Sequence, residues 1–265
     1  MTATPCSNPG GREFDQAGIL ERLAIAPGKI GFYYKDIKSG RSFGLHEDQL
    51  FQAASVIKLP IFAAILLLCR RGQASLEEKL QAKKSDRVPP CGALYFFTDE
   101  PFVDIRTLCG LMITISDNTA TNMLIRRFGI DVLNEGFRAL GLKKTVLNRL
   151  LFDAGASAAG KENYIVPREM AELLEKIYRK ELISPEASRF MEETLLLQQI
   201  NHKIPGYLND AVAVAHKTGE DDGISNDVGI VYTADPFVVC FASNETDVAG
   251  FEPLMRQISL ELSGL

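Results

Sequence analysis

The segment "QAASVIKLPIF", residues 52–62, places a serine and a lysine three positions apart within an apolar run. If the segment is a helix, Ser55 and Lys58 share one face and the amine can reach the hydroxyl. A desolvated lysine with a lowered pKa could then take the proton of a serine that is otherwise a weak nucleophile. The alternative is an N-cap-like serine beside a lysine that extends to solvent, and the pair alone does not decide between the two.

A second polar group, Ser116-Asp117-Asn118, interrupts two apolar helical patterns within "MITISDNTATNMLI". All three residue types favour caps and turns, so the end of one helix and the N-cap of the next is a sufficient explanation. The functional alternative is that the Ser116 hydroxyl passes a proton to a leaving amine while the Asn118 amide holds a substrate carbonyl.

The third group is Lys217-Thr218-Gly219 within "AVAHKTGEDDG". In a strand, Lys217 and Gly219 lie on one face, while His216 and its period-two neighbours lie on the other. Lys217 and Thr218 could bind a carboxylate at a cleft, and Gly219 would let a substrate approach the backbone closely. A solvent-facing lysine is the alternative for Lys217, and we expect His216 to be packed rather than catalytic.

These groups form one S-x-x-K, one S-D-N and one K-T-G motif in that order, 61 residues and then a further 101 residues apart. This combination is documented in class A β-lactamases and penicillin-binding proteins, and over nearly its whole length the chain resembles class A serine β-lactamases and related serine hydrolases. The resemblance implies an acyl-enzyme mechanism on a small-molecule β-lactam or peptide-like substrate, with no cofactor and no metal. A non-catalytic binding module is disfavoured, because it would have no reason to retain all the motif residues.

The resemblance also implies a role for each motif position. It implies the following set: Ser55 as nucleophile, Lys58 as its base, Ser116 as proton relay, Asn118 as contact for the substrate's side-chain amide, Lys217 and Thr218 with Gly219 as the carboxylate-binding strand, and the backbone N–H groups of Ser55 and Glu220 as the oxyanion hole. Each such donor supplies about 3 kcal/mol to a tetrahedral intermediate. An acidic Glu220 is unusual at a carboxylate-binding site.

One motif of class A enzymes is missing. Their E-x-x-L-N loop supplies the glutamate that activates the deacylating water, but here Leu151 stands two residues after Arg149, where that glutamate is expected. Asp153 is the nearest carboxylate and a candidate base, with a loop-capping role as its alternative; Glu162 is expected to be a solvated loop residue. Without a substitute base, the alternative function is a penicillin-binding or DD-peptidase/esterase-like acyltransferase with slow deacylation.

The elements that must position these residues follow a simple order. Strand patterns at residues 29–46 and 212–244 flank a helical block, and the chain begins and ends with helical patterns. We therefore predict an α+β, β-lactamase/transpeptidase-like fold, with an antiparallel sheet from both termini, flanking helices and an inserted all-α lobe. The predicted division is a discontinuous α/β lobe (1–50 plus 205–265) and an all-α lobe (51–204), with the active-site cleft between them.

The composition of the chain argues against some classes of binding partner. The 265 residues are 46% hydrophobic with net charge −5 and no basic stripe, which argues against nucleic acid binding. The longest apolar run, residues 59–69, is too short to span a membrane, and we expect a monomer. The N-terminus lacks an apolar h-region, so we expect no signal peptide in this chain. Localisation stays open: periplasmic or secreted if a leader was removed, otherwise cytoplasmic.

The cysteines and histidines predict neither disulfides nor a metal site. Five widely spaced cysteines without a C-x-x-C pattern indicate free thiols, and three scattered histidines are too few for a zinc site. The resemblance adds that Cys109 occupies one position of the disulfide found in some class A enzymes, while Phe62 occupies the other. We therefore expect five reduced thiols in the denatured protein.

Overall fold

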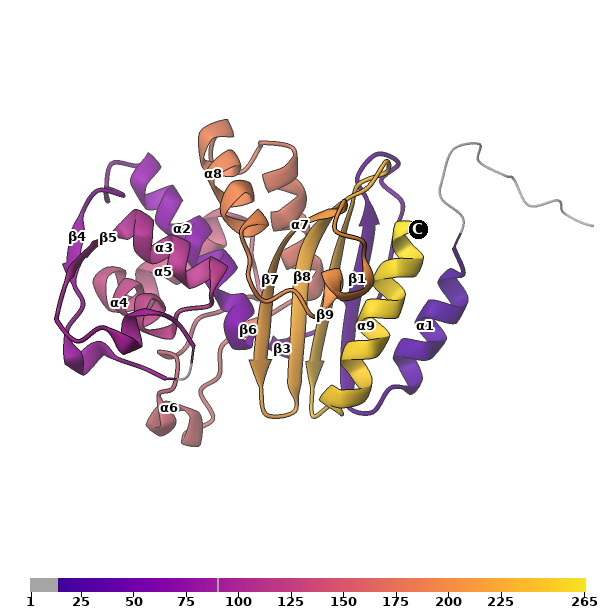
Figure 1. Cartoon of the computed structure of the whole chain (residues 1–265), viewed down its shortest axis with the longest axis horizontal. Coiled ribbons are helices and arrows are strands. Elements are labelled where there is room, and N and C mark those ends of the chain that lie inside the picture. Colours follow the sequence, from indigo (N-terminus) through magenta and orange to yellow (C-terminus); the bar gives the residue numbers. More distant parts are fainter. Residues whose placement is uncertain (1–13, 90) are drawn as a thin grey trace, which may run out of the picture.

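The computed structural model describes residues 14–89 and 91–265. Its centre is a five-stranded antiparallel sheet in the order β2-β1-β9-β8-β7, so strands from the two ends of the chain pair directly (Figure 1). This confirms the predicted sheet. The strands are β1 (Lys29–Asp36), β2 (Ser42–Leu45), β7 (Ala213–Asp221), β8 (Ile224–Tyr232) and β9 (Phe237–Asn244).

Both faces of the sheet are covered by helices. On β1, Phe32 packs in the core beneath the terminal helices α1 (Gln16–Ile25) and α9 (Val248–Ser263), whereas Tyr33 joins the core that extends to α7 (Pro167–Tyr178). Because successive strand residues point to opposite faces and helices cover both faces, six of the eight residues of β1 are buried. The terminal helices lie side by side at the right of Figure 1.

The inserted block is mainly helical, as expected, and also contains short strands. Two short antiparallel ladders, β3–β6 and β4–β5, and the short helix α6 were not predicted, because segments of two to five residues carry no readable periodicity. The elements of the block and its edges are β3 (Phe51–Gln52), η1 (Ala54–Ile57), α2 (Lys58–Arg70), β4 (Lys79–Gln81), η2 (Lys84–Asp86), η3 (Leu94–Phe96), β5 (Phe102–Asp104), α3 (Ile105–Thr114), α4 (Asn118–Phe128), α5 (Ile130–Ala139), α6 (Ala154–Ala158), β6 (Tyr164–Ile165), α8 (Pro185–Leu196) and η4 (Ile204–Tyr207).

The four cysteines in the described part of the chain are free thiols: Cys69, Cys91, Cys109 and Cys240. This agrees with the predicted lack of a disulfide for those four, while Cys6 lies outside the described residues. The apolar run that forms α2 is buried in the core at nearly every position. Within residues 14–89 and 91–265, none of the helices combines the length and the apolar character needed to cross a bilayer.

Candidate active site

Ser55 and Lys58 are brought together by a change of helix type. Ser55 lies in the 3₁₀ turn η1, and Lys58 is the first residue of α2. A 3₁₀ turn nearly eclipses side chains three residues apart, so the two groups meet more directly than the predicted α-helical spacing requires. The Lys58 Nζ lies 2.9 Å from the Ser55 Oγ, which establishes the contact on which the nucleophile hypothesis depends.

Lys58 is completely buried, so the alternative of a lysine extending to solvent is wrong. Its Nζ also lies 2.8 Å from the Ser116 carbonyl oxygen, 2.9 Å from the Ser116 Oγ and 2.8 Å from the Asn118 Oδ1. Burial lowers the pKa of the Lys58 amine well below its usual value, and the nearby Lys217 charge lowers it further. A neutral amine can donate its two N–H groups to the carbonyl and amide oxygens and keep its lone pair for a serine hydroxyl proton.

The S-D-N motif serves as a helix junction and as a site element at once. Asp117 is the N-cap of α4 and accepts the N–H of Ala120, as the capping interpretation predicted. Its other carboxylate oxygen accepts the N–H groups of Ala93 and Leu94 at 2.7 and 2.9 Å. Ser116, between the two helices, has a φ of 56°, a left-handed conformation that non-glycine residues seldom adopt. The buried Asp117 therefore fixes the turn that presents Ser116 to Lys58.

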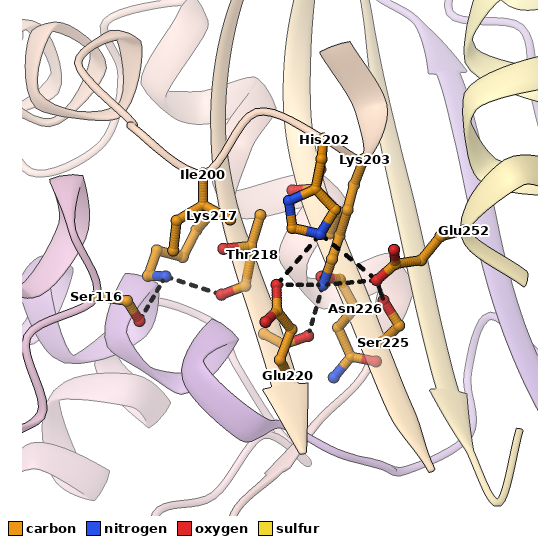
Figure 2. Close-up of polar contacts among 12 residues, drawn as sticks. Ser116, Ile200, His202, Lys203, Lys217, Thr218, Glu220, Ser225, Asn226 and Glu252 are labelled. Carbon is orange, nitrogen blue, oxygen red and sulfur yellow. Dashed lines mark hydrogen bonds and ion pairs between the residues drawn. The ribbon is translucent and has the colours of Figure 1, made fainter. Parts of the chain in front are cut away.

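Lys217 approaches Ser116 from the other side of the cleft. Its Nζ donates to the Ser116 Oγ at 3.1 Å and to the Thr218 carbonyl oxygen at 2.8 Å (Figure 2). Lys217 is completely buried rather than solvent-facing, and burial lowers its pKa to about 7, with Asp227 raising it and Lys203 lowering it. The Ser116 hydroxyl is thus held between two amines, which suits a group that passes a proton. We call Ser55, Lys58, Ser116, Asn118 and Lys217 the polar cluster.

Gly219 brings strand β7 against the turn that carries the nucleophile. A Cβ at this position would lie 2.9 Å from the Ala53 carbonyl oxygen and 3.1 Å from the Ser55 backbone nitrogen. Only glycine lets the two backbones approach this closely. The contact places the backbone N–H of Ser55 beside the strand that continues to Glu220, as an oxyanion hole built from those two donors requires.

His216 lies away from this chemistry. It is 1% exposed, its Nδ1 lies 2.9 Å from an Asp227 carboxylate oxygen, and its Nε2 lies 3.0 Å from the Asn201 Oδ1. Both ring nitrogens therefore have partners inside the protein. The prediction of a packed, hydrogen-bonded histidine is confirmed.

A cleft of about 520 Å³ opens above the polar cluster. Lys58 and Lys217 are buried beneath its surface. The predicted site residues that line it come from the helical block, the loop after residue 148 and strand β7: Ser55, Ser116, Asn118, Asp153, Thr218 and Glu220. Segments that are far apart in the sequence therefore meet at one cavity.

The loop across the cleft presents an apolar residue where a glutamate was expected. Leu151 lines the cavity, and Asn122 holds its backbone by accepting its N–H and donating to its carbonyl oxygen, both at 2.9 Å. Glu162 is not the solvated loop residue we expected: it forms an ion pair with Arg149, and both side chains are mostly buried. The Arg149–Glu162 ion pair joins the two ends of the loop, and Leu151 between them lines the cleft.

Asp153 is the N-cap of α6. Its Oδ1 accepts the N–H of Ala156 at 3.0 Å, and the residue is exposed. The loop-capping interpretation is confirmed. The carboxylate also lines the cleft, so a role in activating water stays a hypothesis.

A second charged cluster at the end of β7 was missed by the sequence analysis (Figure 2). The ligand atoms of His202, Glu220 and Glu252 lie within 4.8 Å of one another, a set that could hold a metal ion. The Lys203 ammonium already lies 3.2 Å from a Glu220 oxygen and 3.9 Å from a Glu252 oxygen, so it supplies the positive charge there. Spacing could not reveal this group, because its members come from the segment before η4, from β7 and from α9.

The similarities to known proteins extend over most of the chain. Residues 17–264 match the model of a β-lactamase enzyme family. A β-lactamase of Rhodobacter capsulatus is 28% identical over 245 residues, 89% of this chain and 80% of that protein. A crystal structure of a β-lactamase from Sphaerobacter thermophilus is 28% identical, covers 93% of this chain and 96% of that one, and has a TM-score of 0.85.

The structure of PBP-A is 31% identical and covers 94% of both chains, with a TM-score of 0.85. A leucine-to-glutamate mutant of PBP-A, in an acyl-enzyme complex with penicillin G, is 30% identical, again covers 94% of both chains and has a TM-score of 0.84.

Proposed function

The chain belongs to the β-lactamase enzyme family and is a hydrolase of that kind, and we propose that it opens β-lactam rings through an acyl-enzyme on Ser55. The observation that carries this proposal is the contact between the Ser55 Oγ and the fully buried Lys58 Nζ, at 2.9 Å. A neutral amine in that position is a base within hydrogen-bond reach of the hydroxyl.

In the proposed acylation, Lys58 takes the hydroxyl proton as the Ser55 Oγ attacks the lactam carbonyl carbon. The backbone N–H groups of Ser55 and Glu220 stabilise the oxyanion of the tetrahedral intermediate. The carbon–nitrogen bond of the ring then breaks, and Ser116 donates its proton to the departing nitrogen. The Ser116 hydroxyl contacts both Lys58 and Lys217, so the lost proton can be replaced from the polar cluster.

Asn118 and β7 would orient the substrate in the cleft. Asn118 lines the cavity and is fixed by its contact with Lys58, so its amide is held in place before a substrate arrives. Thr218 also lines the cavity, beside the buried Lys217. We propose that Asn118 meets a substrate amide and that Lys217 and Thr218 meet a substrate carboxylate.

Deacylation is the step that distinguishes two members of this function class. Leu151 cannot activate water, and Glu162 is committed to Arg149. A long-lived acyl-enzyme, as in a penicillin-binding protein or a slow DD-peptidase or esterase, is therefore the second candidate function. The likeness to PBP-A fits this candidate, because a leucine-to-glutamate mutant of that protein forms an acyl-enzyme complex with penicillin G.

Intact-protein mass over time after mixing with penicillin G tests the proposal, with Ser55→Ala as the control. We expect wild type to gain one drug-sized adduct and Ser55→Ala to gain none. An adduct that disappears as product accumulates would mean hydrolysis, and Asp153 would then be the first carboxylate to replace. A persistent adduct would favour the penicillin-binding alternative. Intact drug and unmodified wild-type protein would overturn the active-serine proposal.

A further inference from the structure

The mouth of the cleft is acidic, although the groups beneath it are amines. Among residues 14–89 and 91–265, four carboxylate side chains line the cavity, and of these Glu162 forms an ion pair with a lining cation, Arg149. The other three belong to Asp153, Glu220 and Asp221. Coulomb repulsion in a partly desolvated cleft acts on a negatively charged ligand group that is placed beside one of these carboxylates.

Glu220 differs from the other carboxylates of the cavity because it contacts the buried Lys203. Lys203 is completely buried, and its Nζ lies 3.1 Å from the Gly219 carbonyl oxygen, 3.3 Å from the Asn226 carbonyl oxygen and 3.2 Å from the Glu220 Oε1 (Figure 2). An ammonium has three N–H groups, and these three acceptors account for all of them. Lys203 therefore has no donor left for an incoming anion.

The half-exposed Glu220 carboxylate lies between this cation and the cavity. Its side chain is 51% exposed and lines the cleft, whereas Lys203 has no exposed surface. The His202 Nε2 lies 3.5 Å from the same Glu220 oxygen. The protein's own carboxylate thus occupies the place at which a ligand carboxylate could otherwise pair with Lys203.

We propose that Glu220 is a specificity-determining residue, whose carboxylate disfavours substrates with an anionic group toward the end of β7 and favours those that are neutral or cationic there. This inference rests on the proposed Ser55 acylation and adds a substrate preference to it. Discrimination would arise from repulsion of the wrong ligand, because like charges held close in a cleft oppose binding.

The test compares penicillin G, an anion, with its neutral methyl ester. Acylation rate constants would be measured by intact mass at low ionic strength, where surface charges are least screened, for wild type and Glu220→Gln. We expect Glu220→Gln to raise the ratio of the rate constant for penicillin G to that for the ester about tenfold. Glutamine keeps the shape of the side chain and an acceptor oxygen for Lys203, and the thermal midpoint would verify that the variant is folded.

Asp221→Asn is the matched control, because Asp221 also lines the cleft but has no ion pair with Lys203 among the described contacts. A smaller change in the anion-to-ester ratio for Asp221→Asn than for Glu220→Gln supports the proposal. An unchanged ratio in Glu220→Gln, or an equal change in both variants, would overturn it. If neither compound acylates any of the proteins, the proposed function itself fails, and the inference with it.

Discussion

The polar cluster and the loop of residues 149–163 face each other across one cleft, but they are built differently. In the polar cluster, Lys58 is fully buried and contacts three other residues, and Ser116 is held between two amines. In the loop, the residue facing the cavity is the apolar Leu151, and the charged Glu162 is turned to Arg149. One side is arranged for proton transfer and the other is not.

This difference separates the two halves of a hydrolytic cycle. Forming an acyl-enzyme requires a nucleophile, a base and a proton relay, and the polar cluster contains a residue for each. Releasing the acyl group requires a base placed to activate a water molecule. In the loop, the mostly buried Glu162 is paired with Arg149 and Asp153 is exposed, so acylation should outpace release.

Removing the base should have the largest effect. In Lys58→Met the Ser55 hydroxyl has no amine to take its proton, so we expect acylation by penicillin G to slow about 10²–10⁴-fold. In wild type, acylation should slow as the pH falls through the lowered pKa of Lys58, because only the neutral amine accepts a proton. Stopped-flow or mass-based rates from pH 5 to 9 would measure both effects.

Lys58→Arg separates the two properties of this lysine, because arginine keeps the positive charge and cannot act as a base. It should be as slow as Lys58→Met if the amine is the base. Recovery of the wild-type rate by arginine would mean that charge alone matters.

The buried Lys217 should also make the free energy of unfolding depend on pH. Its pKa is about 7 in the folded protein, against an ordinary 10.5, so between these values the unfolded chain binds a proton that the folded chain lacks. The free energy of unfolding contributed by this group therefore rises with pH, by about 2–3 kcal/mol from pH 7 to 9. Urea unfolding of Lys217→Met should lack this increment, so the variant should gain most over wild type at pH 7.

The exposed Lys143 provides the matched control. Lys143→Met should follow wild type at both pH values, since this exposed side chain is not buried by folding. If Lys217→Met and wild type show the same pH dependence of unfolding, burial does not lower the pKa of Lys217.

A substitution at Leu151 can supply the carboxylate that the loop lacks at this position. Leu151→Glu would place a carboxylate at the cavity wall, and we expect the lifetime of the acyl-enzyme to fall about tenfold while acylation changes little, because a general base accelerates attack by water. Leu151→Gln has the same size without the proton acceptor. Equal shortening in both variants would attribute the effect to lost packing of Leu151, which is 8% exposed, rather than to a base.

The fold was largely predictable because long elements carry periodic patterns. The strand patterns at residues 29–46 and 212–244 and the helical block between them were expected, since regularly spaced apolar side chains mark the buried faces of long elements. The ladders β3–β6 and β4–β5 could not be expected, as two- and three-residue strands depend on tertiary pairing. The same applies to the 3₁₀ turn around Ser55, which the sequence indicated only as helix.

The site was predictable where a motif is local and unpredictable where contacts join distant segments. Ser55 and Lys58 are three residues apart, so helix geometry indicated their proximity, and Ser116 and Asn118 belong to one three-residue motif. The pairing of Glu162 with Arg149, and the network of Lys203 with Glu220 and Glu252, depend on how loops fold back. No spacing rule reports such contacts, and both alter the charge of the cleft.

The smallest expected effect concerns Asp153, the carboxylate nearest to the missing glutamate in sequence. Its Oδ1 already accepts the N–H of Ala156. The residue is exposed, so its carboxylate would hold a water molecule only weakly. Asp153→Asn preserves a capping side chain but removes the proton acceptor, and we expect it to slow deacylation by about twofold or less. Asp153→Ala should also lower the stability of the loop by about 1 kcal/mol, since the cap is lost. A deacylation rate reduced tenfold or more in Asp153→Asn, with acylation unchanged, would instead identify Asp153 as the base and make the two sides of the cleft chemically complementary.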